Sequence, residues 1–194
     1  MKTVKAILII SLLFILCSFD LPEGWVQAGS KPKSYEMGID KDLKHEGGNV
    51  ATIKSIDNKI IGFGTMMQSC LPDKYLGKRI RFSGMLKTKD VVEWSAFWFR
   101  VDQQNSEVAL AFDNMHEGKI DRSIRGTTEW KWYEIVLDVP LKAINLAYGV
   151  LLEGTGQVWF SDLKLEVVDN SVPLTVNEKY YMPLKEPTNL NFKN

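Results

Sequence analysis

Side chains suited to ligand binding alternate with core-forming ones in the stretch EWSAFWFRVD, residues 93–102. Read as a β-strand, this segment carries Trp94, Trp98, Arg100 and Asp102 on one face. Its other face carries Phe97, Phe99 and Val101. Successive side chains of a strand point to opposite sides, so the second set can be buried while the first stays accessible. Aromatic surfaces combined with a few fixed polar groups are typical of binding sites for small ligands such as sugars. The first face is therefore our candidate site.

A turn at QQNS, residues 103–106, would fold the chain back into a hairpin. The pairs on the core face would then be Val101 with Val108, Phe99 with Leu110, and Phe97 with Phe112. On the candidate face the opposing residues would be small, Ala109 and Ala111, which leaves room for a ligand. A slip of one residue would exchange the two faces.

Arg81 and Asp113 would join the candidate face if their strands lie in the same sheet. Asp102 and Asp113 could then form the carboxylate pair of a hydrolase or lyase acting on polysaccharide. Alternatively, the tryptophans pack beneath a loop or the C-terminal tail, Arg100 pairs with Asp102, and the protein is a structural module at the cell surface. We expect a non-catalytic binding module whose partner is a carbohydrate or another small polar ligand.

The rest of the chain predicts an all-β fold. After residue 20 no stretch has a sustained helical period, and strand-like segments alternate with turn residues. The clearest segments are NVATIKSI, KRIRFSGML, WYEIVLDV, AINLAYGVLLEG and QVWFSDLKLEVVD. Many short strands joined by turns indicate a sandwich or barrel. We assign this domain to residues 21–169. Residues 170–194 have three prolines and no clear period, which indicates a C-terminal tail.

The N-terminus has the pattern of an export signal. Lys2 and Lys5 precede an apolar run over residues 6–16. This run is shorter than the about 20 apolar residues of a spanning helix and has the length of a signal-peptide core. We expect residues 1–18 to be a signal peptide or a membrane anchor, and lipidation of Cys17 is a further alternative. Each would place the domain outside the cytoplasm, secreted or periplasmic, with membrane contact only through this segment.

The charge balance and the small numbers of cysteine and histidine reduce the range of functions that the sequence allows. Lys and Arg number 24, and Asp and Glu also number 24, among 194 residues. With this balance the chain has no excess of basic residues, whereas nucleic-acid binding requires a basic surface. The two cysteines cannot build a disulfide framework. The two histidines, His45 and His116, have no nucleophile or acid at a recognisable catalytic spacing.

Several motifs together resemble an uncharacterised bacterial jelly-roll family. They include GWVQAGS, YEMGID, HEGGNVATIKS, GFGTMMQS, IRGTTEWKWYEIVLDVP and GVLLEGTGQVWFSDLKLEVVD. Members of this family occur alone behind a signal peptide or joined to AraC-type regulators. The resemblance implies a jelly-roll β-sandwich of the galactose-binding-domain-like type, which many carbohydrate-binding modules share. It implies no single role, because the fold hosts many functions. This chain departs from the pattern by extra residues between Met115 and Ile124, which would lengthen a loop.

The same resemblance implies a structural calcium ion, which such folds often hold between the first strands and the last one. The matching acidic residues here are Asp40 and Asp162, with Asn49 as a weaker candidate. Calcium takes 6 to 8 oxygen ligands, so these residues alone would not complete the site. The alternative is that Asp40 is a turn or cap residue.

Overall fold

The structure, a computed structural model, describes residues 19–116 and 120–175. Antiparallel strands and one short 3-10 turn make up this part of the chain. The elements are β1 (Val26–Ala28), η1 (Pro32–Ser34), β2 (Tyr35–His45), β3 (Gly48–Ser55), β4 (Phe63–Cys70), β5 (Lys78–Gln103), β6 (Ala111–Asp113), β7 (Ile124–Val139), β8 (Ala143–Glu153) and β9 (Gln157–Val168). Within these residues, no helix has the length and apolar character needed to cross a membrane.

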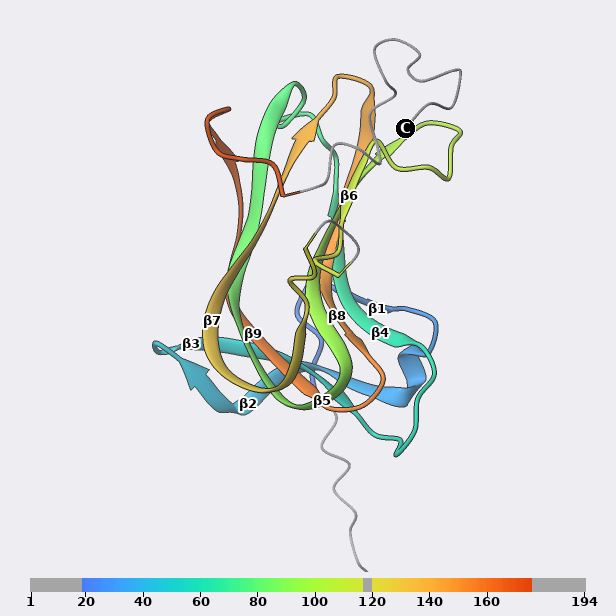
Figure 1. Cartoon of the computed structure of the whole chain (residues 1–194), viewed down its shortest axis with the longest axis vertical. Coiled ribbons are helices and arrows are strands. Elements are labelled where there is room, and N and C mark those ends of the chain that lie inside the picture. The colour runs from blue at the N-terminus through green and yellow to red at the C-terminus, as the bar shows by residue number, and fades with distance from the viewer. Residues whose placement is uncertain (1–18, 117–119, 176–194) are drawn as a thin grey trace, which may run out of the picture.

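Strand β5 runs through both layers of the molecule (Figure 1). Its first part, residues 78–89, pairs with β7 on one side and β9 on the other. Its second part, residues 94–103, pairs with β8 and β6. Asp90 lies between the two parts with φ 51°, a left-handed conformation in which the strand changes direction. One continuous strand thus links the two sheets.

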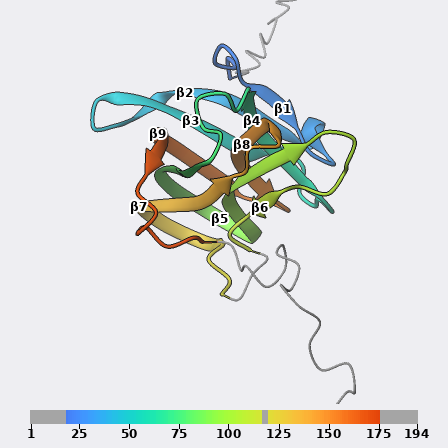
Figure 2. The ribbon, with the colours of Figure 1, turned by 90° about the horizontal axis from the view of Figure 1, so that it is seen from above.

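We name the two layers after their central strands. The β9 sheet has the order β7, first part of β5, β9, β3 and β2. The β8 sheet has the order β6, second part of β5, β8, β4 and β1. Figure 2 shows the layers from above.

The core lies between these layers. Phe82 of the β9 sheet contacts Phe97 of the β8 sheet at a ring-centroid distance of 4.8 Å. It also contacts Tyr148 at 5.2 Å. Phe97, Phe99 and Val101 are all fully buried, which confirms the predicted core face of the second part of β5. The predicted all-β sandwich is therefore confirmed.

The predicted hairpin register is wrong by three residues. Val101 pairs with Ala111, and Phe99 pairs with Asp113. The chain returns after a longer loop than the four-residue turn we expected, because β5 ends at Gln103 and β6 begins only at Ala111. An odd shift exchanges the faces of the returning strand, so Ala111 is buried toward the core rather than facing Trp98.

The C-terminal segment contacts the sandwich as far as it is described. The backbone N–H of Thr175 donates to the carbonyl of Val136 in β7 at 3.1 Å. The Val136 N–H donates in return to the Thr175 hydroxyl at 2.9 Å. Residues 1–18, assigned to an export signal, and residues 176–194 of the predicted tail lie outside the described residues.

Candidate functional site

Trp98 lies across the outer face of the β8 sheet. Its indole Nε1–H donates a hydrogen bond to Oγ1 of Thr65 at 2.8 Å. Thr65 belongs to β4, which lies beyond β8 from β5, and neighbouring strands are about 4.8 Å apart. The indole can therefore reach Thr65 only by extending across β8. The β8 residue paired with Trp98 is Gly149, where a Cβ would collide with the carbonyl oxygen of Met66, so the glycine lets β4 approach β8 closely. Trp98 is half-buried, so it forms a platform on the sheet surface.

A chain of polar groups continues from this platform along β5. Arg100 Nε lies 2.6 Å from Asp102 Oδ1, in a contact that is electrostatic rather than a well-aligned hydrogen bond. The other oxygen of Asp102 accepts a hydrogen bond from the Asn145 amide at 2.9 Å. Arg100 Nη2 also donates to the carbonyl of Glu107 at 2.8 Å. These contacts fix the positions of both charged groups. We call the surface of Trp98, Arg100, Asp102, Asn145 and Thr65 the Trp98 face.

A cavity of ≈ 260 Å³ lies beside Arg100 on this surface. Its other lining residues are Glu107, Val108, Ala109 and Phe112. Phe112 of β6 pairs with Arg100 of β5, so both side chains lie on the outer face of the β8 sheet. The loop between β5 and β6 thus bounds one end of the Trp98 face.

Trp94 is also on the outer side of β5, but a loop covers one of its ring faces. Its ring stacks on His116 with a centroid distance of 4.5 Å and an interplanar angle of 23°. His116 lies 3.4 Å from Asp121 in the same loop. A hydrogen bond from Ser123 is the main reason that the pKa of Asp121 is well below its usual range. Packing beneath a loop, one of the alternatives from the sequence, therefore describes Trp94 better than Trp98.

The structure does not bring Arg81 and Asp113 to the Trp98 face. Arg81 lies on the β9 sheet, where it pairs with Glu166 at 3.0 Å and Glu134 at 3.4 Å. Asp113 is 3% exposed and forms an ion pair with Arg122. It pairs with buried Phe99, whereas Asp102 is on the outer side of β5. The two aspartates therefore point to opposite sides of the sheet and form no carboxylate pair.

Sequence reasoning missed two residues of the Trp98 face, Thr65 and Asn145, and the neighbouring Gly149. Each lies in a segment with a recognisable strand pattern. The missing information was the strand order, because only the pairing of β4 with β8 and of β8 with β5 brings these residues to Trp98.

The acidic residues that the resemblance assigned to calcium have other partners. Asp40 Oδ1 accepts the backbone N–H groups of Asp42 and Leu43 at 3.0 and 3.1 Å, which is the geometry of a turn residue. Its Oδ2 accepts the indole N–H of Trp159 at 2.8 Å. Among the described residues, no three or more His, Cys, Asp and Glu side chains form a group that could hold a metal ion. Both carboxylate oxygens of Asp40 therefore already have hydrogen-bond donors within the protein.

Asp162 is part of a different cluster. Its Oδ2 lies 2.9 Å from Nδ1 of His45 and accepts a hydrogen bond from the Ser161 hydroxyl at 2.9 Å. The bond with His45 is the largest cause of a lowered pKa for the Asp162 carboxyl. His45 also contacts Trp130 of β7 at a centroid distance of 4.4 Å. This cluster connects His45, near the tip of the β2–β3 hairpin, to strands β9 and β7 of the same sheet.

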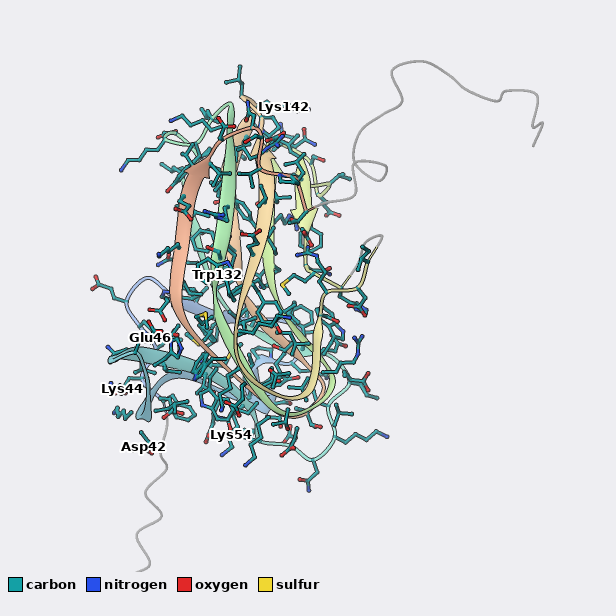
Figure 3. The ribbon with its side chains drawn as sticks, turned by 60° about the vertical axis from the view of Figure 1, so that its left-hand side comes forward. Asp42, Lys44, Glu46, Lys54, Trp132 and Lys142 are labelled. Carbon is teal, nitrogen blue, oxygen red and sulfur yellow. The ribbon has the colours of Figure 1, made fainter. Side chains whose placement is uncertain are left out.

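A further tryptophan is exposed on that sheet. Trp132 of β7 is 40% exposed and lies above the tip of the β2–β3 hairpin, where Lys44 and Glu46 are labelled (Figure 3). The structure records no hydrogen bond that orients its indole among the described residues. Trp132 is therefore a useful comparison with Trp98, whose indole is fixed.

A side cleft of ≈ 450 Å³ opens between the two sheets. Its lining includes the aromatic residues Trp25, Phe82, Tyr148 and Phe160. The Tyr148 hydroxyl donates to Gln68 at 2.8 Å. Burial raises the pKa of Tyr148 to about 12, so this hydroxyl remains neutral. The cleft is bounded on one side by β9, through Leu163 and Leu165.

Comparison with solved structures places this geometry among known folds. The CBM22-1 xylan-binding domain of Paenibacillus barcinonensis Xyn10C matches 76% of this chain and 88% of its own, with a TM-score of 0.54 and 10% identity. The chain shares its jelly-roll fold with carbohydrate-binding modules. TmCBM61, solved with β-1,4-galactotriose, matches 75% of this chain and 90% of its own, with a TM-score of 0.50 and 14% identity. The enzymatically active domain of tailspike protein 4 from bacteriophage CBA120 gives 0.54 at 14% identity, but the match covers only 20% of that chain. At these identities the likeness concerns the fold alone.

A comparison of sequences identifies a much more similar protein. The uncharacterised HTH-type transcriptional regulator YbfP of Bacillus subtilis is 46% identical over 172 residues, which is 88% of this chain. The chain spans 57% of the length of that regulator. No protein-family model matches the chain.

Proposed function

We propose that this protein is an exported, non-catalytic carbohydrate-binding module whose ligand lies on the Trp98 face. One observation supports this most strongly: Trp98 extends across β8 and is fixed there by its hydrogen bond to Thr65. A ring held in this way presents a flat apolar surface without a further loss of side-chain freedom on binding. The fold shared with carbohydrate-binding modules supports the same class of ligand.

The polar groups beside the platform could bind the hydroxyls of a sugar. Arg100 and Asp102 are half-buried, and their own contacts fix their positions. Hydrogen bonds from charged groups to hydroxyls are stronger than those between neutral groups. A sugar ring over Trp98 would bring its apolar face to the indole and its hydroxyls to Arg100 and Asp102. The opposed orientations of Asp102 and Asp113 remove the carboxylate pair on which the hydrolase or lyase alternative depended.

A glycan array with the purified protein tests this function, and two variants of Thr65 test its geometry. We expect selective binding to one class of glycan. Thr65→Val removes the hydroxyl that fixes Trp98 and should weaken that binding, whereas Thr65→Ser keeps the hydroxyl and should preserve it. An array without any bound glycan, or equal binding by both folded variants, would contradict the proposal.

A further inference from the structure

One edge of β9 is open along most of the strand. On one side β9 pairs with β5 from Gln157 to Val168. On the other side β3 pairs only with Gln157–Phe160. Asp162 then adopts φ 54°, and the register with β5 shifts between Ser83 and Met85. Beyond this bulge, on the side of β9 where β3 pairs earlier in the strand, no described strand pairs with residues 162–168.

Two other edges of the described sandwich, those of β7 and β2, accept hydrogen bonds from other segments of the chain or donate them to such segments. The middle of the β7 edge is capped by Thr175, which exchanges hydrogen bonds with Val136. Arg122 donates to the carbonyl of Glu134 on the same strand at 3.0 Å. At β2, the N–H of Ile39 donates to the carbonyl of Asp20 at 2.9 Å. The open edge of β9 differs from these two edges, because no backbone hydrogen bond to another segment is recorded along its described residues 162–168.

The side chains along this edge alternate in a regular way. Leu163 and Leu165 line the side cleft, and Val167, which is 50% exposed, pairs with buried Ile80 on the same side of the strand. Lys164 and Glu166 are on the outer side, and they carry opposite charges two residues apart. A strand edge with apolar residues and unpaired backbone groups is a template for pairing with another strand.

We propose that a second copy of this chain pairs with this edge, β9 against β9, in antiparallel orientation about a two-fold axis at Leu165. This register places Lys164 of each copy opposite Glu166 of the other, and Leu163 opposite Val167. Registers centred on Lys164 or Glu166 would place two like charges opposite each other, which is destabilising. The charges therefore favour the register centred on Leu165 over these two neighbouring registers, and a two-fold axis makes the interface self-complementary.

The side cleft supplies the space for this contact. It is lined by Leu163 and Leu165, and also by Pro22 and Trp25. A partner strand would bring its own Leu165 and Val167 over the mouth of the cleft, which removes apolar surface of both copies from water. The interface uses the β9 sheet, so it leaves the Trp98 face on the other sheet free. Dimerisation and carbohydrate binding can therefore be tested separately.

The test is the molar mass of the purified protein over a range of concentrations, by light scattering after size exclusion or by sedimentation equilibrium. The wild type should approach the mass of a dimer as concentration rises. Lys164→Glu places two glutamates opposite each other and Glu166→Lys two lysines, so each variant alone should be monomeric. An equimolar mixture of the two should form a heterodimer, because every pair across the axis is again of opposite charge. Lys142→Glu, an exposed change away from β9, should dimerise like the wild type.

Glu166 also pairs with Arg81, so the fold of each variant is checked by circular dichroism. If Glu166→Lys does not fold, Val167→Asp replaces it as the second disrupting variant. A wild type that stays monomeric at every concentration would overturn the proposal. A dimer that persists in Lys164→Glu and in the second variant would also overturn it.

Discussion

At the scale of single residues, two neighbours in β5 have opposite roles. Phe99 is fully buried and contacts Phe82 and Tyr148, with ring centroids 6.4 Å from each. Trp98 is half-buried on the outer face and has its polar end bound to Thr65. The alternation of a strand alone separates core from candidate site here.

The two residues should respond differently to truncation. Phe99→Ala leaves a cavity between the sheets and should lower the free energy of unfolding by about 3–5 kcal/mol. Trp98→Ala should cost clearly less, because one side of the ring already faces solvent. Chemical denaturation of both variants measures this difference. Equal losses would mean that both faces of the strand are buried, which would contradict the binding-face argument.

Asp162 should contribute a pH-dependent part of the stability. Its pKa in the folded protein is lowered, mainly by the bond with His45, from an ordinary value of about 3.9. A carboxyl of this kind stabilises the folded state above its unfolded pKa, and the contribution is lost as pH falls through its folded pKa. Asp162→Asn removes the titration, and Asn tolerates the positive φ at this position. The wild type should therefore be more stable than Asp162→Asn at pH 7, and the difference should shrink below about pH 4. A difference that is constant with pH would refute this role.

At the scale of elements, local patterns were sufficient for the strands but not for their pairing. WYEIVLDV lies within β7 and AINLAYGVLLE forms β8, as their alternation predicts. KRIRFSGML and EWSAFWFRVD also have strand patterns, but they are parts of one strand that bends at Asp90. The register of β6 and the orientation of Asp113 depend on the length of the loop before it. Such features depend on contacts between distant segments, which periodicity does not describe.

The connection between β2 and β9 gives a prediction about calcium. Asp40 accepts three N–H groups, one of them from Trp159 of β9, so its two oxygens already have hydrogen-bond donors. We expect neither excess calcium nor a chelator to change the melting temperature. An ion bound only by the folded state must raise that temperature by mass action. A rise in the wild type that Asp40→Ala abolishes would establish the calcium site that the resemblance implied.

At the scale of the whole molecule, the two sheets separate the two proposed surfaces. The Trp98 face belongs to the β8 sheet, and the open edge of β9 belongs to the other layer (Figure 1). A substitution on one sheet should therefore leave the surface on the other sheet intact. Residues more than about 7–10 Å apart that share no partners usually act independently.

The proposed export concerns the N-terminus of the whole chain. Two lysines followed by an apolar run predict that the protein leaves the cytoplasm. Mass spectrometry of the N-terminus from fractionated cells should find a chain that begins after about residue 18 outside the cytoplasm. A lipid-modified Cys17 would instead place it on a lipid anchor. A cytoplasmic chain that begins at Met1 would contradict export.

The most direct test of the central claim is calorimetric titration of the glycan selected by the array into three proteins. These are the wild type, Trp98→Ala and Trp132→Ala. Both variants lose a partly exposed indole, but Trp132 lies on the other sheet and has no recorded hydrogen bond among the described residues that orients its ring. We expect Trp98→Ala to stay folded and lose binding, while Trp132→Ala should bind as tightly as the wild type. Wild-type affinity in a folded Trp98→Ala variant would show that the outer side of β5 packs the sandwich and binds no sugar.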